Sequence, residues 1–161
     1  MGEPDDPLIP ASEALHLVGA TPTQPELREE DYVRLAAFRR ALRRFLAFSE
    51  HSAREAGLTA QQHQALLSVK GAPPGVAPTV GYLADQLLLA PNSAAELTDR
   101  MVRTGLLERR TAPEDRRRVV LCLTPAAEGV LWRLSADHLR ELSEAAPTLE
   151  ALTALVRDRR A

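Results

Sequence analysis

The chain has 161 residues, of which 45% are hydrophobic and 26% charged, a composition typical of a single globular domain. It contains no run of about 18 apolar residues, so we expect no membrane-spanning helix, and its acidic N-terminus lacks the basic start of a secretory signal. Cys122 is the one cysteine, which excludes an intrachain disulfide and favours the reducing cytoplasm.

Charge is distributed unevenly along the chain. The formal net charge is −2, but residues 1–31 hold eight of the 22 acidic residues and one of the 20 basic residues, a net charge of −7. Residues 32–161 therefore carry a net charge of +5. Because the local field decides whether phosphate is attracted, the sequence does not exclude a nucleic-acid-binding protein. Nineteen of the basic residues are arginines, which suit phosphate and guanine, although genome composition also explains this excess.

The N-terminal part of the chain divides into an arm and a long helix. Residues 1–28 are rich in proline and acidic residues, and we expect an acidic, partly disordered arm with one short helix at 12–18. Apolar residues then recur every three or four positions, which predicts a helix over 29–56 that Gly57 ends. A long helix with a narrow apolar seam needs a partner helix, from this chain or another.

Two short helices follow, each with its own start signal. Thr59, with Gln62 three residues later, forms a capping box and predicts a helix over 60–70. Thr79 is a favourable N-cap and predicts a helix over 80–88.

A third short helix and a hairpin come next. Pro91 has no amide proton and suits the first turn of a helix, which we expect to run to residue 104 and to end at Gly105. Polar and apolar residues then alternate over 107–111 and 118–123, with turn-forming residues between them. This pattern predicts a β-hairpin directly after a pair of helices joined by a tight turn.

The C-terminal part is again helical. Thr124 followed by Pro125 predicts the start of a helix that runs to about residue 145, and Pro147 is expected to break it before a last helix over 149–159. The predicted fold class is therefore mainly α with a small β-hairpin wing.

This order of elements is that of a winged helix-turn-helix. In such a fold the second helix of the pair enters the major groove of DNA, and the hairpin tip reaches the adjacent minor groove or the backbone. The start of that helix must be small or polar, because bulky residues would hold it away from the bases, and residues 91–94 meet this demand. The tip needs positive charge, which residues 116–118 supply as three consecutive arginines.

Several segments of this region resemble the MarR family of transcription regulators. They are Leu83-Ala-Asp-Gln-Leu87, Ser93-Ala-Ala-Glu-Leu-Thr-Asp-Arg100, Gly105-Leu-Leu-Glu-Arg-Arg110, Asp115-Arg-Arg117 and Leu123-Thr-Pro125. The similarity covers roughly residues 30–160, and its most specific feature is the spacing of these motifs from residue 99 to residue 124.

The resemblance implies a homodimer on a pseudo-palindromic DNA duplex. Residues 29–57 and 124–160 would be the dimerisation helices, and residues 58–123 the winged helix-turn-helix, within one domain of residues 29–161. The resemblance also implies a repressor that releases DNA when a small aromatic or phenolic molecule binds between the dimerisation helices and the DNA-binding lobe.

Residue roles follow from the same resemblance. Arg117 matches the wing arginine that enters the minor groove, and Asp115 matches the acid that orients it. Asn92, Ser93 and Glu96 match the outward face of the recognition helix. The predicted DNA-contacting residues are Thr79, Pro91, Asn92, Ser93, Ala94, Glu96, Arg100, Arg116, Arg117 and Arg118.

The sequence leaves some roles open. Arg100 is either a phosphate contact or an ion-pair partner of Asp99, and Glu96 is either simply exposed or an acceptor for cytosine N4. His51 and His63 flank the junction of the first two helices of the domain, where they either line the effector pocket or are ordinary histidines. Cys122 is expected to be a buried structural thiol.

Other classes of function have less support in the sequence. The acidic arm and Glu96 also suit a winged-helix module that binds a protein instead of DNA. We find no glycine-rich phosphate loop and no catalytic Ser, His and Asp order, so we expect no enzyme. The histidines show no HxxxH spacing, so we expect neither a metal site nor a cofactor.

Overall fold

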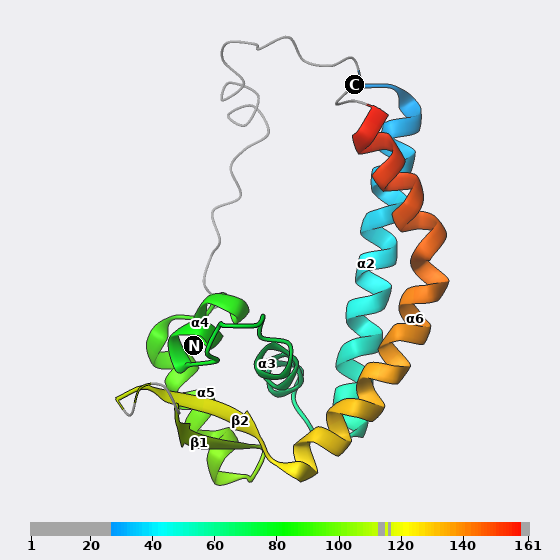
Figure 1. Cartoon of the computed structure of the whole chain (residues 1–161). Coiled ribbons are helices and arrows are strands. Elements are labelled where there is room, and N and C mark those ends of the chain that lie inside the picture. Colours follow the sequence, from blue (N-terminus) through cyan, green and yellow to red (C-terminus); the bar gives the residue numbers. More distant parts are fainter. Residues whose placement is uncertain (1–26, 113–114, 116, 159–161) are drawn as a thin grey trace, which may run out of the picture.

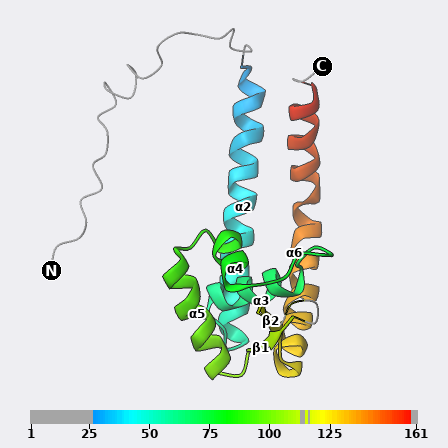
Figure 2. The same ribbon diagram turned by 60° about the vertical axis from the view of Figure 1, so that its left-hand side comes forward.

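Two long helices form one part of the molecule, and a small lobe forms the other (Figure 1). The computed structural model describes residues 27–112, 115 and 117–158. Figure 2 shows, from a second direction, the two long helices lying side by side with the lobe at one end of the pair. The elements in chain order are α2 (Glu29–Glu55), α3 (Ala60–Lys70), α4 (Val80–Leu87), α5 (Pro91–Arg103), β1 (Leu107–Thr111), β2 (Val119–Leu123) and α6 (Pro125–Asp158). In the part of the chain described, no helix is both long and apolar enough to cross a membrane.

The predicted caps hold the short helices in place. The Thr59 hydroxyl accepts the Gln62 amide proton at 3.1 Å, and the Gln62 side chain accepts the Thr59 amide proton at 2.8 Å. The Thr79 hydroxyl accepts the Tyr82 amide proton at 3.2 Å. Each bond satisfies a backbone donor that would otherwise be unpaired at a helix start, so the predictions for α3 and α4 are confirmed.

The turn between α4 and α5 is tight because Leu88 adopts a left-handed conformation, with φ of 53°. The Leu89 amide then donates to the Ala84 carbonyl oxygen at 2.9 Å, which closes the end of α4. Pro91 occupies the first turn of α5, and Gly105 follows that helix with φ of +72°. The predicted start of this helix at Pro91 and its predicted end at Gly105 are both confirmed.

The hairpin has the predicted antiparallel pairing, with Leu107 opposite Leu123 and Arg109 opposite Leu121. The side chains of Leu107, Leu121 and Leu123 are buried, so the hairpin has one face on the core. The Leu121 amide also donates to the Pro78 carbonyl oxygen at 2.8 Å, which fastens the hairpin to the segment that leads into α4.

The core lies mainly inside the lobe. Leu66 of α3, Leu83 of α4, Met101 of α5, and Leu107 and Leu121 of the hairpin are all at most 2% exposed. The same cluster continues onto α6 through Ala127, Leu131 and Leu134, so the lobe and the long helices share one core. Cys122 is only half-buried, on the strand position between two core leucines.

The predicted break at Pro147 is wrong, because α6 continues through this residue to Asp158. Proline removes the amide that would bond to the carbonyl of Ser143, four residues earlier. Both Pro147 and Ser143 are exposed, so water can satisfy that carbonyl, and Leu155 beyond the proline is buried. Packing of α6 on α2 outweighs the local penalty.

Candidate nucleic-acid interface

The outward face of α5 is polar over its whole length. Ala94, Leu97, Thr98 and Met101 point into the core, at most 2% exposed. The helical period therefore places the remaining positions on the other side, where the exposed residues are Asn92, Ser93, Glu96, Asp99, Arg100 and Arg103. A helix with this division can rest on the lobe and present its polar face to a partner.

Not every residue predicted to contact DNA lies on that face. Ala94 is fully buried, which corrects its place among the predicted contacts: it faces the core, where the Thr98 hydroxyl bonds to its carbonyl oxygen at 2.8 Å. Thr79 is half-buried and its hydroxyl is engaged in the cap of α4. Pro91 is exposed at the start of α5.

The hairpin turn is organised by Asp115. Its carboxylate accepts the backbone amide proton of Arg117 at 2.9 Å, and its carbonyl oxygen accepts that of Arg118 at 2.9 Å. The Ala112 amide donates to the Arg118 carbonyl oxygen at 2.8 Å, which closes the turn. Asp115 thus fixes the backbone of the arginines and leaves both guanidinium groups exposed, while Arg116 lies outside the described residues.

Some arginines of the lobe form ion pairs with neighbouring carboxylates, and others do not. Asp99 pairs with Arg109 at 2.5 Å, joining α5 to β1, and Arg110 pairs with Glu108. Arg100 makes no ion pair within the described part of the chain, so the sequence alternative that joined it to Asp99 is not the observed arrangement. The sequence gives no signal for the pair with Arg109, since that contact depends on the turn at Gly105.

One exposed arginine of α5 is not among the residues predicted to contact DNA. Arg103 lies one turn after Arg100 on the same exposed face, and its Nε donates to the Asp99 carbonyl oxygen at 3.4 Å. Its spacing of three residues from Arg100 could have revealed it. Figure 1 shows that the end of the hairpin at which β2 begins lies on the side of the lobe away from α2 and α6.

Thr124 connects the hairpin to the first turn of α6. Its hydroxyl donates to the Gly105 carbonyl oxygen at 2.7 Å and accepts the Ala127 amide proton at 3.2 Å. Its own amide donates to the Leu106 carbonyl oxygen at 3.2 Å. The end of α5, the hairpin and the start of α6 are therefore held in one arrangement.

A groove of about 390 Å³ separates α3 from α6. Its walls are mostly apolar. Two of the lining residues, Lys70 and Glu128, form an ion pair in which the Nζ atom lies 2.5 Å from a carboxylate oxygen. The groove is lined by Leu67, Lys70, Gly71, Glu128, Leu131, Trp132 and Ser135.

The two histidines predicted for an effector pocket lie in different environments. His51 is exposed, 3.4 Å from the Glu55 carboxylate, and lines a shallow cleft between α2 and α6. His63 is 3% exposed and lies against the ring of His138. Within the described residues, no three His, Cys, Asp or Glu side chains gather closely enough to hold a metal ion.

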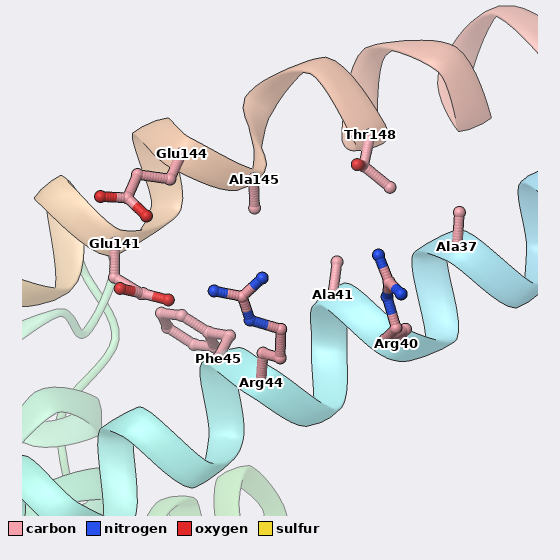
Figure 3. A pocket seen from close by; sticks show the side chains of 9 residues that line it. All are labelled: Ala37, Arg40, Ala41, Arg44, Phe45, Glu141, Glu144, Ala145 and Thr148. Atoms are coloured by element: carbon pink, nitrogen blue, oxygen red, sulfur yellow. The ribbon is translucent and has the colours of Figure 1, made fainter.

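A further cleft, of about 160 Å³, lies higher on α2 and α6 (Figure 3). Arg40 and Arg44 reach into it from α2, and Glu141 and Glu144 lie on the α6 side. The cleft is open to solvent and is lined mainly by charged residues and alanines, whereas the groove beside α3 has mostly apolar walls.

Comparisons with known proteins agree with this geometry. A family model described as "MarR family" matches residues 56–118, which span the three short helices and the first strand of the hairpin and end just before β2. A search of curated protein sequences finds no match.

Solved structures match over most of the chain. A MarR family transcription regulator is 26% identical with a TM-score of 0.63, and the match covers 82% of this chain and 91% of that one. Rv1404 from Mycobacterium tuberculosis is 22% identical with a TM-score of 0.62, covering 87% and 98%. MepR from S. aureus, bound to ethidium bromide, is 16% identical with a TM-score of 0.56, covering 76% and 90%. Its motifs, its fold and these matches support the interpretation of the chain as a MarR-family winged helix-turn-helix transcription regulator.

Proposed function

We propose that this protein is a dimeric repressor that binds a pseudo-palindromic DNA duplex through α5 and the hairpin. The observation that carries the proposal is the pair of exposed, polar elements on one lobe. These are the outward face of α5, with Asn92, Ser93 and Arg100, and the hairpin turn, with Arg117 and Arg118. A helix face of this kind suits the major groove, and arginines on a hairpin suit the phosphates and minor groove beside it.

We expect residues in the first turns of α5 to contact the base edges. Asn92 offers an amide of the kind that pairs with adenine, and Ser93 offers a hydroxyl that pairs with several bases. Glu96 repels phosphate but accepts from cytosine N4, so we expect it to favour a G·C pair at one position of each half-site. Arg100 stands one turn further along and is placed for the backbone.

The long helices supply the surface for a second subunit. Their exposed faces carry large apolar side chains over most of their length, more than a monomer usually leaves in water. These residues are Tyr32, Val33, Leu35, Leu42 and Leu46 on α2, and Leu139, Leu142, Leu149 and Val156 on α6. A twofold dimer through α2 and α6 would cover them and set two α5 helices at a fixed spacing.

A change in the middle of this apolar surface tests the dimer. Leu139 is 69% exposed, so Leu139→Glu places a charge at the proposed interface without disturbing the core. We expect analytical ultracentrifugation to show a dimer for the native protein and a monomer for the variant, with the same helix content by circular dichroism. A native protein that is monomeric at micromolar concentration would contradict the dimer.

The experiment for DNA binding starts from a random duplex pool. Selection of bound duplexes reports the half-site and its spacing, and we expect two inverted half-sites about one helical turn apart. A footprint that overlaps the promoter of the regulated gene, with higher transcription when the protein is absent, would support repression. If no duplex is retained even at low salt, the alternative of a protein-binding winged helix is favoured.

The effector we propose is a small aromatic or phenolic acid bound in the groove between α3 and α6. Leu67, Leu131 and Trp132 form an apolar wall suited to a ring, and a carboxylate or phenolate would compete with Glu128 for the Lys70 ammonium group. The position between the lobe and the dimerisation helices suits control of DNA affinity, and the related MepR structure contains an aromatic cation. A protein with this role would act in the cytoplasm, where its DNA is.

Trp132 provides a direct measurement, since it is the one tryptophan of the chain and lies in this groove. Titration with salicylate should quench its fluorescence and lower DNA affinity, and Leu67→Glu should abolish both effects. Benzyl alcohol, which has the ring without the acid, is the matched control ligand. Quenching without any change in DNA affinity would separate this groove from regulation.

A further inference from the structure

Three helices meet at a buried pair of histidines. His63 of α3 is 3% exposed and His138 of α6 is 8% exposed, and their ring centroids are 4.7 Å apart. Phe45 and Phe48 of α2 pack edge-to-face with the His138 ring at 5.7 and 5.3 Å. The pair therefore lies in an apolar setting where the DNA-binding lobe joins the long helices.

The hydrogen bonds define which nitrogen of His138 carries its proton. Nδ1 lies 2.6 Å from the Leu134 carbonyl oxygen, which can only accept, so Nδ1 donates. In the neutral ring, Nε2 then accepts the proton of the Ser49 hydroxyl, whose oxygen is 2.8 Å away on α2. This bond ties α6 to α2.

The Nδ1 atom of His63 lacks the hydrogen bond that the same atom of His138 makes. It is buried without a hydrogen-bond partner among the described residues. Burial, and then the nearness of His138, lower the pKa of His63 below the ordinary value for a histidine. A proton taken up by either ring therefore creates a buried cation next to another imidazole.

The charged groups around the pair do not compensate such a cation. On α3 the only other ionisable residue is Lys70, at the far end of the helix. On α2, His51 pairs with Glu55, and both side chains are more than half exposed. On α6, Asp137 pairs with Arg140, while Glu141, one turn beyond His138, lines the clefts between α2 and α6. The Arg44 guanidinium shares one of these clefts with Glu141 (Figure 3).

We propose that His63 and His138 form a proton-sensitive joint, and that proton uptake at this pair loosens α3 from α2 and α6 and weakens DNA binding in mild acid. The proposal rests on the DNA-binding function proposed above. α3 contacts α4 and β2 on one side and both long helices on the other, so its position sets the orientation of the whole lobe. Two lobes must keep a fixed spacing to engage two half-sites, and a loosened joint removes that constraint.

The direction of the pH effect follows from proton linkage. Because folding lowers the affinity of His63 for a proton, the unfolded chain binds more protons between the two pKa values. The contribution to stability is fully present above about pH 6.5 and is lost as the pH falls from there toward the folded-state pKa. DNA affinity should fall over the same range.

The test measures affinity for the selected duplex by fluorescence anisotropy between about pH 8 and about pH 5.5, at constant ionic strength. Linkage to one proton per protomer allows a change of up to about 100-fold per pH unit for a dimer, and we expect a loss of at least about tenfold over the whole range. Ordinary surface histidines would do the opposite, because added positive charge strengthens DNA binding. Weakening in acid is therefore specific to the joint.

Two variants separate the pair from other histidines. His63→Phe keeps a ring in the apolar site but removes the proton, and should reduce the ratio of affinities at the two pH values to about twofold. His16→Gln, in the arm outside the described residues, should keep the native ratio. An equal loss for the native protein and His63→Phe, or no loss for the native protein, would overturn the proposal.

A spectroscopic measurement keeps the inference testable if His63→Phe does not fold or if the protein binds no DNA. In the native protein, the His63 ring proton signals should titrate below the ordinary value for a histidine, about pH 6.5, and thermal unfolding should shift to lower temperature as the pH falls below that value. Absence of DNA binding at about pH 8 would refute the proposed function alone. A His63 that titrates at the ordinary value for a histidine, about pH 6.5, would refute the joint alone.

Discussion

The sharpest consequence of the interface is the salt dependence of DNA binding and its change in Arg117→Ala. Arg100, Arg117 and Arg118 make no ion pair with the described residues and are exposed on each protomer. A dimer that places all of them on phosphates makes about six contacts and should show a slope of about −5.4 in log K against log salt. An increase from about 50 to about 200 mM salt would then weaken binding about 2,000-fold.

Arg117→Ala removes one such arginine from each protomer. About four contacts remain, the slope falls to about −3.6, and the same increase in salt weakens binding only about 150-fold. Fluorescence anisotropy with the selected duplex and with an unrelated duplex measures both slopes. Because phosphate contacts carry no sequence information, the absolute loss of affinity should be similar for the two duplexes.

Two control variants test whether the change in salt dependence is specific to Arg117. Arg39→Ala removes an exposed arginine of α2, remote from the lobe, and should leave the slope unchanged. Arg117→Lys keeps the charge but not the planar fork, so it should keep the slope and lose affinity if the guanidinium enters the minor groove. If Arg117→Ala retained the native slope, the hairpin would not contact DNA and the proposed orientation of the lobe would be wrong.

Three further changes probe the fold by urea unfolding. Thr59→Ala removes the hydroxyl that accepts the Gln62 amide proton and should lower the free energy of unfolding by about 1 kcal/mol, whereas Thr59→Ser should change little. Leu66→Ala empties a fully buried site and should lower it by about 2–5 kcal/mol, and a loss below that range would mean that the core collapses around the gap. Pro147→Ala restores a helical amide and should raise it by about 1–3 kcal/mol; a decrease would show that the proline fits its site without penalty.

Much of the fold was predictable because its signals are local. Thr59, Thr79 and Pro91 act on backbone amides within three residues, so their effects do not depend on the rest of the molecule. The alternation over 107–123 likewise reports a hairpin with one buried face. Wherever the decisive interaction spans only a few residues, sequence and structure agree.

Predictions were less successful where tertiary contacts decide the outcome. Pro147 is a strong local breaker, yet packing along α2 keeps α6 continuous through it. Asp99 has Arg100 as its neighbour in sequence but pairs with Arg109, which the chain reversal at Gly105 brings beside α5. The contact of His63 with His138 joins helices at opposite ends of the domain, and no spacing rule could reveal it.

The same tertiary contacts explain how a small change at the joint can control DNA binding. α5 has 13 residues and is about 20 Å long, so a rotation of the lobe by about 10° moves one end of α5 relative to the other by about 3.5 Å. That displacement equals about one base-pair step along the duplex, whose rise is about 3.4 Å. The hydrogen bonds from Thr124 to Gly105 and from Leu121 to Pro78 hold the elements of the lobe together. We therefore expect the lobe to rotate as one unit. Control of this protein is therefore more effective at α3, where the lobe meets α2 and α6, than at the DNA-contacting residues themselves.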